Sequence, residues 1–464
     1  MLEKKRNIHF IGVGGVGMSG LALLLHRMGH RVSGCDAAKS KYLEPLLKEG
    51  IEVYLGHDPS HLKEAEIVVY SSAIPKDNPE IREAKERGLL LVPRARMLSE
   101  VMQIYPKSIV VAGSHGKTTT TSLIAEILLN LNLHPTAIVG GIINNIKSHS
   151  LLGSGDYLVA EADESDGSFL LYSPFIEVIT NIDREHLDFY ADFQAIKKAF
   201  ANFILRVHPE GRVILCKDDP GVREVVEDLS GPFLFYGFSE GVDLQGKIVK
   251  NGAYPVVEVY YRGKRLGKFR LGIPGVHNAL NALGAIGVAL TLKLPIKKVM
   301  TILENFRGVK RRLELKGIYR GALLMDDYAH HPKEIAATLE TVGKLYPDKR
   351  IILLFQPHRY SRTKALWEDF LMALKDPDIL VLTEIYPASE APLPGITGEA
   401  FYEAVKKIRG IKPTFFVQTL REGEDLLKGL LSPECVFISM GAGNVYKIHE
   451  AFLGEEQVER HAVA

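Results

Sequence analysis

Short apolar runs recur along the chain, and most of them end in a glycine loop or in a cluster of polar residues. Clear examples are residues 7–11, 109–111, 157–160 and 322–325, and segments with apolar side chains every three or four positions lie between such runs. A short apolar run followed by a segment of helical period is typical of a βα unit. Repetition of this unit predicts parallel α/β sheets.

The alternating pattern restarts near Pro106 and again after the basic run 306–314, which is of a kind that usually forms a solvated linker. A chain of 464 residues accommodates roughly three domains of about 150 residues. We therefore predict three α/β domains: an N-terminal Rossmann-like domain at residues 1–105, a central P-loop ATPase-like domain at 106–313 and a C-terminal Rossmann-like domain at 314–464.

The first apolar run is followed by Gly12-Val-Gly-Gly-Val-Gly17, which fits the pattern G-x-G-x-x-G. A second predicted strand ends at Asp36, close to where a dinucleotide-binding fold places the acid that binds a ribose. Alone, this pattern predicts an NAD site, but the same loop serves any nucleotide diphosphate. The segment 71–74, which begins with Ser71 and Ser72, follows the third strand at the sheet edge where such folds bind ligands.

A second glycine loop follows residues 109–111 and leads through a lysine and threonines into an apolar-periodic helix. Strand, glycine loop, Lys-Thr and helix together form a phosphate cradle, in which the hydroxyl group can bind Mg²⁺. Val111 stands where the Walker pattern has its first glycine, so the loop is a shorter variant; the alternative is a tight turn between a strand and a helix. The candidate nucleotide-binding residues are Gly113, Ser114, His115, Gly116, Lys117, Thr118 and Thr119.

The densest acidic segment follows the predicted strand 157–160 and contains Glu161, Asp163, Glu164 and Asp166, while His186 follows the next strand. Carboxylates with an imidazole at neighbouring strand ends can hold a hard metal ion. The alternative is a solvated acidic turn beside a helix. A phosphate loop in the same domain favours the metal, because Mg²⁺ commonly bridges carboxylates and nucleotide phosphates.

Asn278 and Asn281 lie three residues apart at the start of an Ala/Gly-rich helix and share one face. They suit recognition of an adenine edge, or else one of them caps the helix. Each of four apolar strands in the third domain ends in polar residues. One of these ends carries His358, Arg359 and Arg362, which form a candidate anion site.

The formal net charge of +1 gives no reason to expect nucleic acid or an acidic membrane surface as a partner. Five glycines interrupt the apolar run 8–25, so a strand and a phosphate loop explain it better than a signal peptide. Other apolar runs are too short or too charged to span a membrane, and a cytoplasmic protein is expected. Cys35, Cys216 and Cys435 lack metal-binding spacing and are interpreted as buried, inert thiols.

Together, these motifs resemble those of the Mur ligases, ATP-dependent amide-bond ligases of peptidoglycan precursor synthesis. The similarity covers all three predicted domains and is carried jointly by eleven segments. They are residues 12–20, 113–118, 161–166, 180–183, 185–188, 275–278, 310–314, 327–332, 356–362, 386–392 and 441–444.

The resemblance implies that the first domain binds a UDP sugar rather than NAD, the second binds ATP with Mg²⁺ or Mn²⁺, and the third binds an amino acid. The implied UDP-sugar residues are Gly14, Gly15, Gly17, Met18, Ser19, Asp36, Ser72, Glu164 and Ser165. Asn278, Asn281, Arg312 and Asp327 are implied to join the phosphate loop in binding ATP, and Thr118, Glu161 and His186 to bind metal. Tyr328, His330, His358, Arg359 and Arg362 are implied at the amino acid and reacting centre.

The reaction implied by the resemblance joins L-alanine to the lactyl carboxylate of UDP-N-acetylmuramate through an acyl phosphate, in a monomer or homodimer. Lys117, His186, His330, Arg359 and Arg362 are the expected catalytic residues, and the base remains open between the two histidines. A recycling ligase for a murein tripeptide is a nearer alternative, although its acidic motif continues differently after Glu164. An NAD-dependent oxidoreductase would leave the Lys117 loop and the third domain unexplained.

Overall fold

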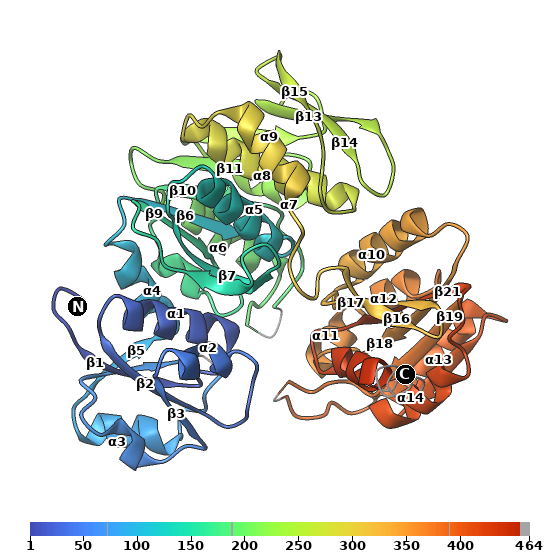
Figure 1. Cartoon of the computed structure of the whole chain (residues 1–464), viewed down its shortest axis with the longest axis horizontal. Helices are drawn as coiled ribbons and strands as arrows, with labels where there is room; N and C mark the ends of the chain where they lie inside the picture. The colour runs from blue at the N-terminus through green and yellow to red at the C-terminus, as the bar shows by residue number, and fades with distance from the viewer. Residues whose placement is uncertain (72, 187–188, 389, 455–464) are drawn as a thin grey trace, which may run out of the picture.

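The computed structural model describes residues 1–71, 73–186, 189–388 and 390–454. These residues form three β-sheets with helices packed on them, and the sheets follow one another along the sequence. Figure 1 shows the N-terminal sheet in blue, the central sheet in teal to yellow, and the C-terminal sheet in orange and red. The α/β fold class predicted from the apolar runs is confirmed. None of the described helices is both long enough and apolar enough to cross a membrane.

The first sheet is parallel, with strand order β3-β2-β1-β4-β5. Strand β1 is central, and the chain leaves it through the glycine loop into α1. A strand in this position puts its carboxyl end at the point where the strand order reverses, which is where open α/β sheets bind ligands. The elements are β1 (Asn7–Ile11), α1 (Val16–Arg27), β2 (Arg31–Asp36), α2 (Leu43–Lys48), β3 (Glu52–Leu55), η1 (Pro59–Leu62), β4 (Ile67–Tyr70), α3 (Pro79–Glu86), β5 (Leu90–Pro93) and α4 (Arg94–Met102).

The central sheet has ten strands in the order β15-β14-β13-β12-β11-β10-β6-β9-β7-β8. Its middle is parallel, and antiparallel pairs close both edges. Strand β6 lies between β10 and β9, so the phosphate loop and the two acidic segments emerge side by side. Its elements are β6 (Lys107–Ala112), α5 (Lys117–Asn130), β7 (Thr136–Ile143), β8 (Ser148–Leu151), β9 (Tyr157–Glu161), η2 (Ser168–Leu171), β10 (Ile176–Ile179), α6 (Phe193–Ile204), β11 (Arg212–Cys216), α7 (Pro220–Val226), β12 (Phe233–Gly237), β13 (Leu244–Lys250), β14 (Val256–Tyr261), β15 (Lys264–Arg270), α8 (Val276–Thr291) and α9 (Ile296–Asn305).

The C-terminal sheet has six strands in the order β16-β17-β21-β18-β19-β20, with only the β16–β17 pair antiparallel. The four strands predicted from apolar runs are β17, β18, β19 and β21, and they form its buried centre. Its elements are β16 (Glu314–Tyr319), β17 (Ala322–Asp327), α10 (Pro332–Leu345), β18 (Arg350–Phe355), α11 (Tyr360–Ala365), α12 (Trp367–Ala373), β19 (Ile379–Thr383), α13 (Gly398–Arg409), β20 (Thr414–Val417), α14 (Leu420–Lys428), β21 (Cys435–Met440) and η3 (Val445–Lys447).

Helix α1 joins the first sheet to the central one. Its buried side chains, among them Leu21 and Leu24, belong to the same apolar cluster as Ile138 and Phe200 of the central region. Burial of apolar surface stabilises such a contact by about 25 cal/mol per Å². Helix α1 is therefore packed against the central region as well as against its own sheet.

Candidate active site

The phosphate loop between β6 and α5 depends on two glycines with positive φ angles. The φ angle is 128° at Gly113 and 82° at Gly116. A β-carbon at Gly116 would also collide with the side-chain oxygen of Asn281 on α8. A residue with a side chain would thus be strained here and would displace the α8 amide, so the glycines of this loop are structural requirements.

Lys117 begins α5 and points its ammonium group into the loop. Its Nζ donates to the carbonyl oxygen of Gly113 at 2.6 Å and lies 2.9 and 3.0 Å from the two carboxylate oxygens of Glu164. The side chains of Lys117 and Glu164 are only 17% and 2% exposed. Burial alone would lower the pKa of Lys117, but Glu164 and Asp163 raise it above its ordinary value, so the lysine is a fixed positive charge.

Two groups of potential metal ligands flank Lys117. In the first, the Thr118 hydroxyl donates to Glu161 at 3.1 Å, and the Gly140 N–H also donates to this carboxylate. In the second, His186 Nε2 lies 3.5 Å from Glu185 and 3.7 Å from Glu164. Ligand atoms of the second group all lie within 4.8 Å of one another. These oxygen-rich sets fit the preference of Mg²⁺ and Mn²⁺ for hard ligands.

The second group of potential metal ligands contains two residues that were not expected there from the sequence. Glu164, expected near the UDP sugar, lies on Lys117 and beside His186. Glu185 was not selected from the sequence, although it directly precedes His186. Its pKa is about 2, because His115, Arg362 and His330 outweigh the effect of its burial, and it is therefore a carboxylate at neutral pH.

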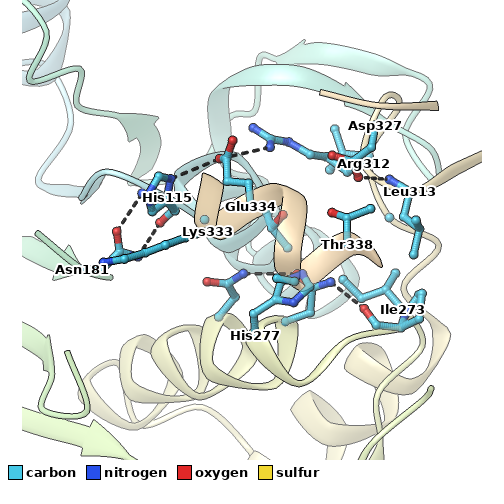
Figure 2. A pocket seen from close by; sticks show the side chains of 18 of the residues that line it. His115, Asn181, Ile273, His277, Arg312, Leu313, Asp327, Lys333, Glu334 and Thr338 are labelled. Carbon is cyan, nitrogen blue, oxygen red and sulfur yellow. Dashed lines mark hydrogen bonds and ion pairs between the residues drawn. The ribbon is translucent and has the colours of Figure 1, made fainter. Parts of the chain in front are cut away.

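A cavity of about 280 Å³ lies between α8 of the central region and α10 of the C-terminal region (Figure 2). Asn278, Asn281, Arg312 and Asp327 all line it, as do Gly116 and Thr119 of the phosphate loop. The structure therefore brings the expected ATP residues of two regions to one cavity. Asn278 donates to the Pro274 carbonyl at 2.6 Å.

Neither asparagine caps α8, because the N-cap position is Gly275 and no side chain caps it. The side chain of Asn281 donates to the Asn278 oxygen at 3.2 Å. His277 on the same turn is neutral at physiological pH, since burial lowers its pKa to about 4. The capping alternative is thus wrong, and the two amides form part of the cavity wall.

Charged side chains of the central and C-terminal regions form ion pairs with one another beside the phosphate loop. His115 lies 3.4 Å from Asp183 and 3.2 Å from Glu334 of α10, while Lys333 contacts Asp183 at 2.6 Å. Figure 2 shows the contact between His115 and Glu334 as a dashed line. Burial would lower the pKa of His115, but hydrogen bonds with Asp183 and Glu334 raise it to about 10.

Asp183, Lys333 and Glu334 were not identified from the sequence. The contacts of Lys333 with Asp183 and of Glu334 with His115 depend on how the central and C-terminal regions meet, and such contacts leave no local spacing pattern. Glu334 also lies 3.8 Å from Arg312, an expected ATP ligand, so α10 is electrostatically linked to the nucleotide cavity.

The expected amino-acid residues gather at the carboxyl ends of β17 and β18. The rings of His330 and His358 have centroids 6.1 Å apart, and His358 stacks on Tyr386 at 5.5 Å. Arg362 Nη1 lies 3.2 Å from His358 Nδ1. Burial lowers the pKa of His330 to about 4 and that of His358 to about 3, so both imidazoles are neutral at physiological pH.

Arg359 and Tyr328 complete this group. Arg359 adopts a φ angle of 71° before α11, and its Nε lies 3.7 Å from Glu390. Tyr328 lies beneath both Arg311 and Arg312, whose guanidinium carbons are 5.0 and 5.3 Å from its ring centre. The basic run that includes these arginines therefore lines the site, and the solvated-linker interpretation is wrong for Arg311, which also pairs with buried Asp326.

A second cavity, of about 510 Å³, is lined by residues from all three regions. Val16 and Lys41 come from the first, Lys117 from the second, and His330 from the third. The start of α1, the phosphate loop and the C-terminal strand ends thus face one chamber. The rest of its lining includes Tyr42, Thr118, Gly140, Glu161, His186, Lys310, Arg312, Tyr328, Glu334 and Tyr446.

The first glycine loop is held by Asp36, whose carboxylate accepts from the Gly14 N–H at 2.8 Å. This carboxylate is turned into the loop instead of standing free for a ribose. Arg94 covers Gly17, since a β-carbon there would lie 3.2 Å from its Nη1. Arg94 thus adds a positive charge at a loop suited to a diphosphate, and it was not selected from the sequence.

Other expected UDP-sugar residues occupy varied places. Met18 is buried in the apolar core, and the Ser19 hydroxyl contacts His149 of β8 at 3.1 Å. Gly15 begins α1 as its N-cap, and the Ser165 N–H is bonded to Asp163. Ser72 lies outside the described residues. Their roles in substrate binding stay predictions.

Comparison with known proteins places the chain in one family. Three models match successive parts of the chain: the Mur ligase family catalytic domain (residues 7–106), the Mur ligase middle domain (111–289) and the Mur ligase glutamate ligase domain (311–443). The chain belongs to the Mur ligase family of ATP-dependent amide-bond ligases. Family membership favours the ligase interpretation over an NAD-dependent oxidoreductase.

Individual relatives carry closely similar names. A UDP-N-acetylmuramate–L-alanine ligase from Solidesulfovibrio magneticus is 45% identical over 457 residues, covering 98% of this chain and 100% of the relative. The Aquifex aeolicus protein of the same name is 44% identical over 460 residues, covering 99% of both. Among solved structures, the UDP-N-acetylmuramate–alanine ligase of Thermotoga maritima is 29% identical with a TM-score of 0.84, covering 98% of this chain and 100% of that chain.

Proposed function

We propose that this chain joins L-alanine to the lactyl carboxylate of UDP-N-acetylmuramate, with cleavage of ATP to ADP and phosphate. The relatives named above carry this activity in their names, and they align over nearly the whole chain. The observation that carries the proposal is the chamber lined by all three regions, because a ligase of two substrates and a nucleotide must bring three ligands to one point.

We assign the UDP sugar to residues 1–105, ATP to 106–313 and the amino acid to 314–464. The Gly12–Gly17 loop and Arg94 would hold the diphosphate, as backbone N–H groups at a helix start and a guanidinium group bind such anions. Asp36 supports this loop from below, through the N–H of Gly14.

ATP would lie with its adenine against Asn278 and Asn281 and its phosphates on the Lys117 loop. Arg312 and, from the C-terminal region, Asp327 reach the same cavity and suit the phosphates and the ribose. Mg²⁺ fits Thr118 with Glu161, and a second ion fits Glu164, Glu185 and His186. When bound, such ions neutralise charge on the transferring phosphoryl group.

The chemistry needs an acyl phosphate because a free carboxylate has no acceptable leaving group. Lys117 holds its charge at the phosphoryl group in transfer and stabilises the charge that develops there. The alanine carboxylate suits Arg359 and Arg362, which would direct its amine toward the acyl carbon. His330 is neutral and can accept a proton from the attacking amine, and His186 is the other candidate for this role.

The residues that bind ATP and alanine lie on separate regions, so closure is expected during turnover. The contacts of His115 with Glu334 and of Lys333 with Asp183 lie beside the phosphate loop, and they are candidates for the contacts that form on closure. They join the two regions in this structure through α10.

The test is phosphate release from ATP and UDP-N-acetylmuramate with L-alanine, glycine, L-serine or the murein tripeptide as acceptor. L-Alanine should give the highest kcat/KM, and mass spectrometry should detect the alanyl product. A higher kcat/KM for the tripeptide would assign the chain to the recycling reaction instead. No release above the acceptor-free rate with L-alanine would overturn the proposal.

A further inference from the structure

A second cluster of chemically active side chains lies in the first region, on the sheet face that carries α3. It comprises His9 of β1, Cys35 of β2, His57 after β3, His61 of η1 and Glu80 of α3. His9, Cys35 and Glu80 are fully buried. Cys35 packs with Val68 and Ile81 in a small apolar cluster separate from the one that contains α1. The cluster is therefore distinct from the active-site chamber.

The donor atoms of this cluster converge. Cys35 Sγ lies 2.8 Å from Glu80 Oε2 and 3.3 Å from His57 Nδ1. His57 Nδ1 lies 3.2 Å from Glu80 Oε2, and His9 Nε2 lies 3.7 Å from Glu80 Oε1. Bonds of about 2.0–2.3 Å in a tetrahedral zinc site place ligand atoms roughly 3.3–3.8 Å apart. Most of these spacings already approach that arrangement.

The hydrogen bonds within this cluster leave one buried ring nitrogen unsatisfied. His9 Nε2 is buried and makes no hydrogen bond to any residue that the structure describes. Glu80 Oε1, at 3.7 Å, lies beyond hydrogen-bonding distance, and a buried ring nitrogen without a hydrogen bond is costly, so it points to a missing ligand. The other ring nitrogen of His9 is 2.9 Å from the Ser33 hydroxyl. Such a contact on the second nitrogen is typical of histidines that bind metal, because it fixes the tautomer and the ring orientation.

We propose that His9 Nε2, Cys35 Sγ, His57 Nδ1 and Glu80 bind one Zn²⁺ ion, with His61 supporting Glu80 from outside. Imidazole, thiolate and carboxylate are the ligand types of zinc sites. Cys35 would lose its proton to solvent on binding, as metal-bound cysteines do. His61 Nδ1 lies 2.7 Å from Glu80 Oε1 and would orient this carboxylate.

The site would also restrain the first glycine loop. The carbonyl oxygen of Cys35 accepts the N–H groups of Gly12 and Val13 at 2.8 and 2.9 Å, and the next residue, Asp36, holds Gly14. An ion that fixes Cys35 would therefore fix the start of the loop. Deuterium uptake by the peptide covering residues 10–17 should be slower with zinc than after chelation, and equal uptake would contradict this link.

The decisive experiment is cobalt reconstitution of the chelator-treated full-length protein, with zinc content measured in parallel by mass spectrometry. Co²⁺ should add a thiolate-to-metal charge-transfer band in the near ultraviolet, and zinc should displace it at one ion per chain. The active-site candidates contain no thiol, so Co²⁺ bound there would not give this band.

Cys35→Ser should abolish the band, and His57→Ala, at a partly exposed position, should weaken zinc binding by about tenfold or more. Cys435→Ser is the matched control, because Cys435 is also buried but lies beside Ser432 and Arg350. This control should keep the band. A folded wild-type protein without the band, or a Cys35→Ser variant that retains it, would overturn the proposal.

Discussion

Replacement of Lys117 by alanine would leave a buried carboxylate without its principal partner. The Lys117 ammonium lies 2.9 and 3.0 Å from the oxygens of Glu164, whose side chain is 2% exposed. Removing one partner of a buried ion pair costs about 3–5 kcal/mol. Burial already raises the pKa of Glu164, so this carboxyl can take up a proton and limit the loss. We expect Lys117→Ala to lower the free energy of unfolding by about 3 kcal/mol, which corresponds to a fall in Tm of about 6–12 °C for a domain of this size.

Activity should fall further than stability. Lys117 holds its charge where the phosphoryl group is transferred, and loss of one such group costs about 10²–10³-fold in kcat. Phosphate release at saturating ATP and differential scanning fluorimetry would measure the two effects separately. The double variant Lys117→Ala/Glu164→Gln removes both charges and should regain most of the lost stability without regaining activity.

Lys344→Ala is the matched control, since Lys344 contacts Glu340 at 2.6 Å on the surface of α10. Exposed helix pairs of this kind contribute about 0.3–0.5 kcal/mol, so this variant should keep both Tm and activity. Phosphate release by Lys117→Ala within about tenfold of the wild type would refute the phosphate role. A double variant as unstable as the single one would refute the electrostatic reasoning.

Three further predictions concern other parts of the site. Asn281→Ala should raise the KM for ATP about tenfold and leave that for L-alanine unchanged in initial-rate assays; an unchanged KM for ATP would remove the amide from the nucleotide site. Arg362→Lys should raise the KM for L-alanine about tenfold, because lysine lacks the planar fork, and an equal rise for ATP would contradict its assignment. Burial, with a smaller effect of Lys41, lowers the pKa of His149 to about 4, below the value of about 6.5 in unfolded chains. The contribution of neutral His149 to the free energy of unfolding is therefore complete above pH 6.5 and is lost as the pH falls toward 4, by on the order of 3 kcal/mol. In denaturant titrations, the free energy of unfolding of His149→Gln should depend less on pH than that of the wild type, and an identical pH dependence would disprove this cause.

The sequence predicted those parts of the fold whose signals are local. Strands such as β6 and β18 are continuous apolar runs because both faces of a parallel sheet are buried. Three of the edge strands were not predicted: β3 and β20 have only four residues each, and β16 mixes charged and exposed positions with apolar ones, as sheet edges do. Their pairing follows from the neighbouring strand and not from a pattern of their own.

The same division holds for the site. The Lys117 loop was predicted because glycine, lysine and threonine are required at fixed spacing around a phosphate. Glu334 escaped prediction because it reaches His115 only after two regions have packed together. The contacts of Cys35 with His9 and Glu80 were not predicted, because these residues are distant in sequence and only the packing of β1, β2 and α3 brings them together.

The central claim is that, within one chamber, the enzyme transfers a phosphoryl group from ATP to the substrate carboxylate before the amine attacks. Oxygen-18 in both carboxylate oxygens of UDP-N-acetylmuramate tests this claim directly, with mass spectrometry of the phosphate released during L-alanine ligation. An acyl phosphate carries one carboxylate oxygen into the departing phosphate, so each turnover should give phosphate with a single oxygen-18 atom. Unlabelled phosphate released together with alanyl product would contradict the account.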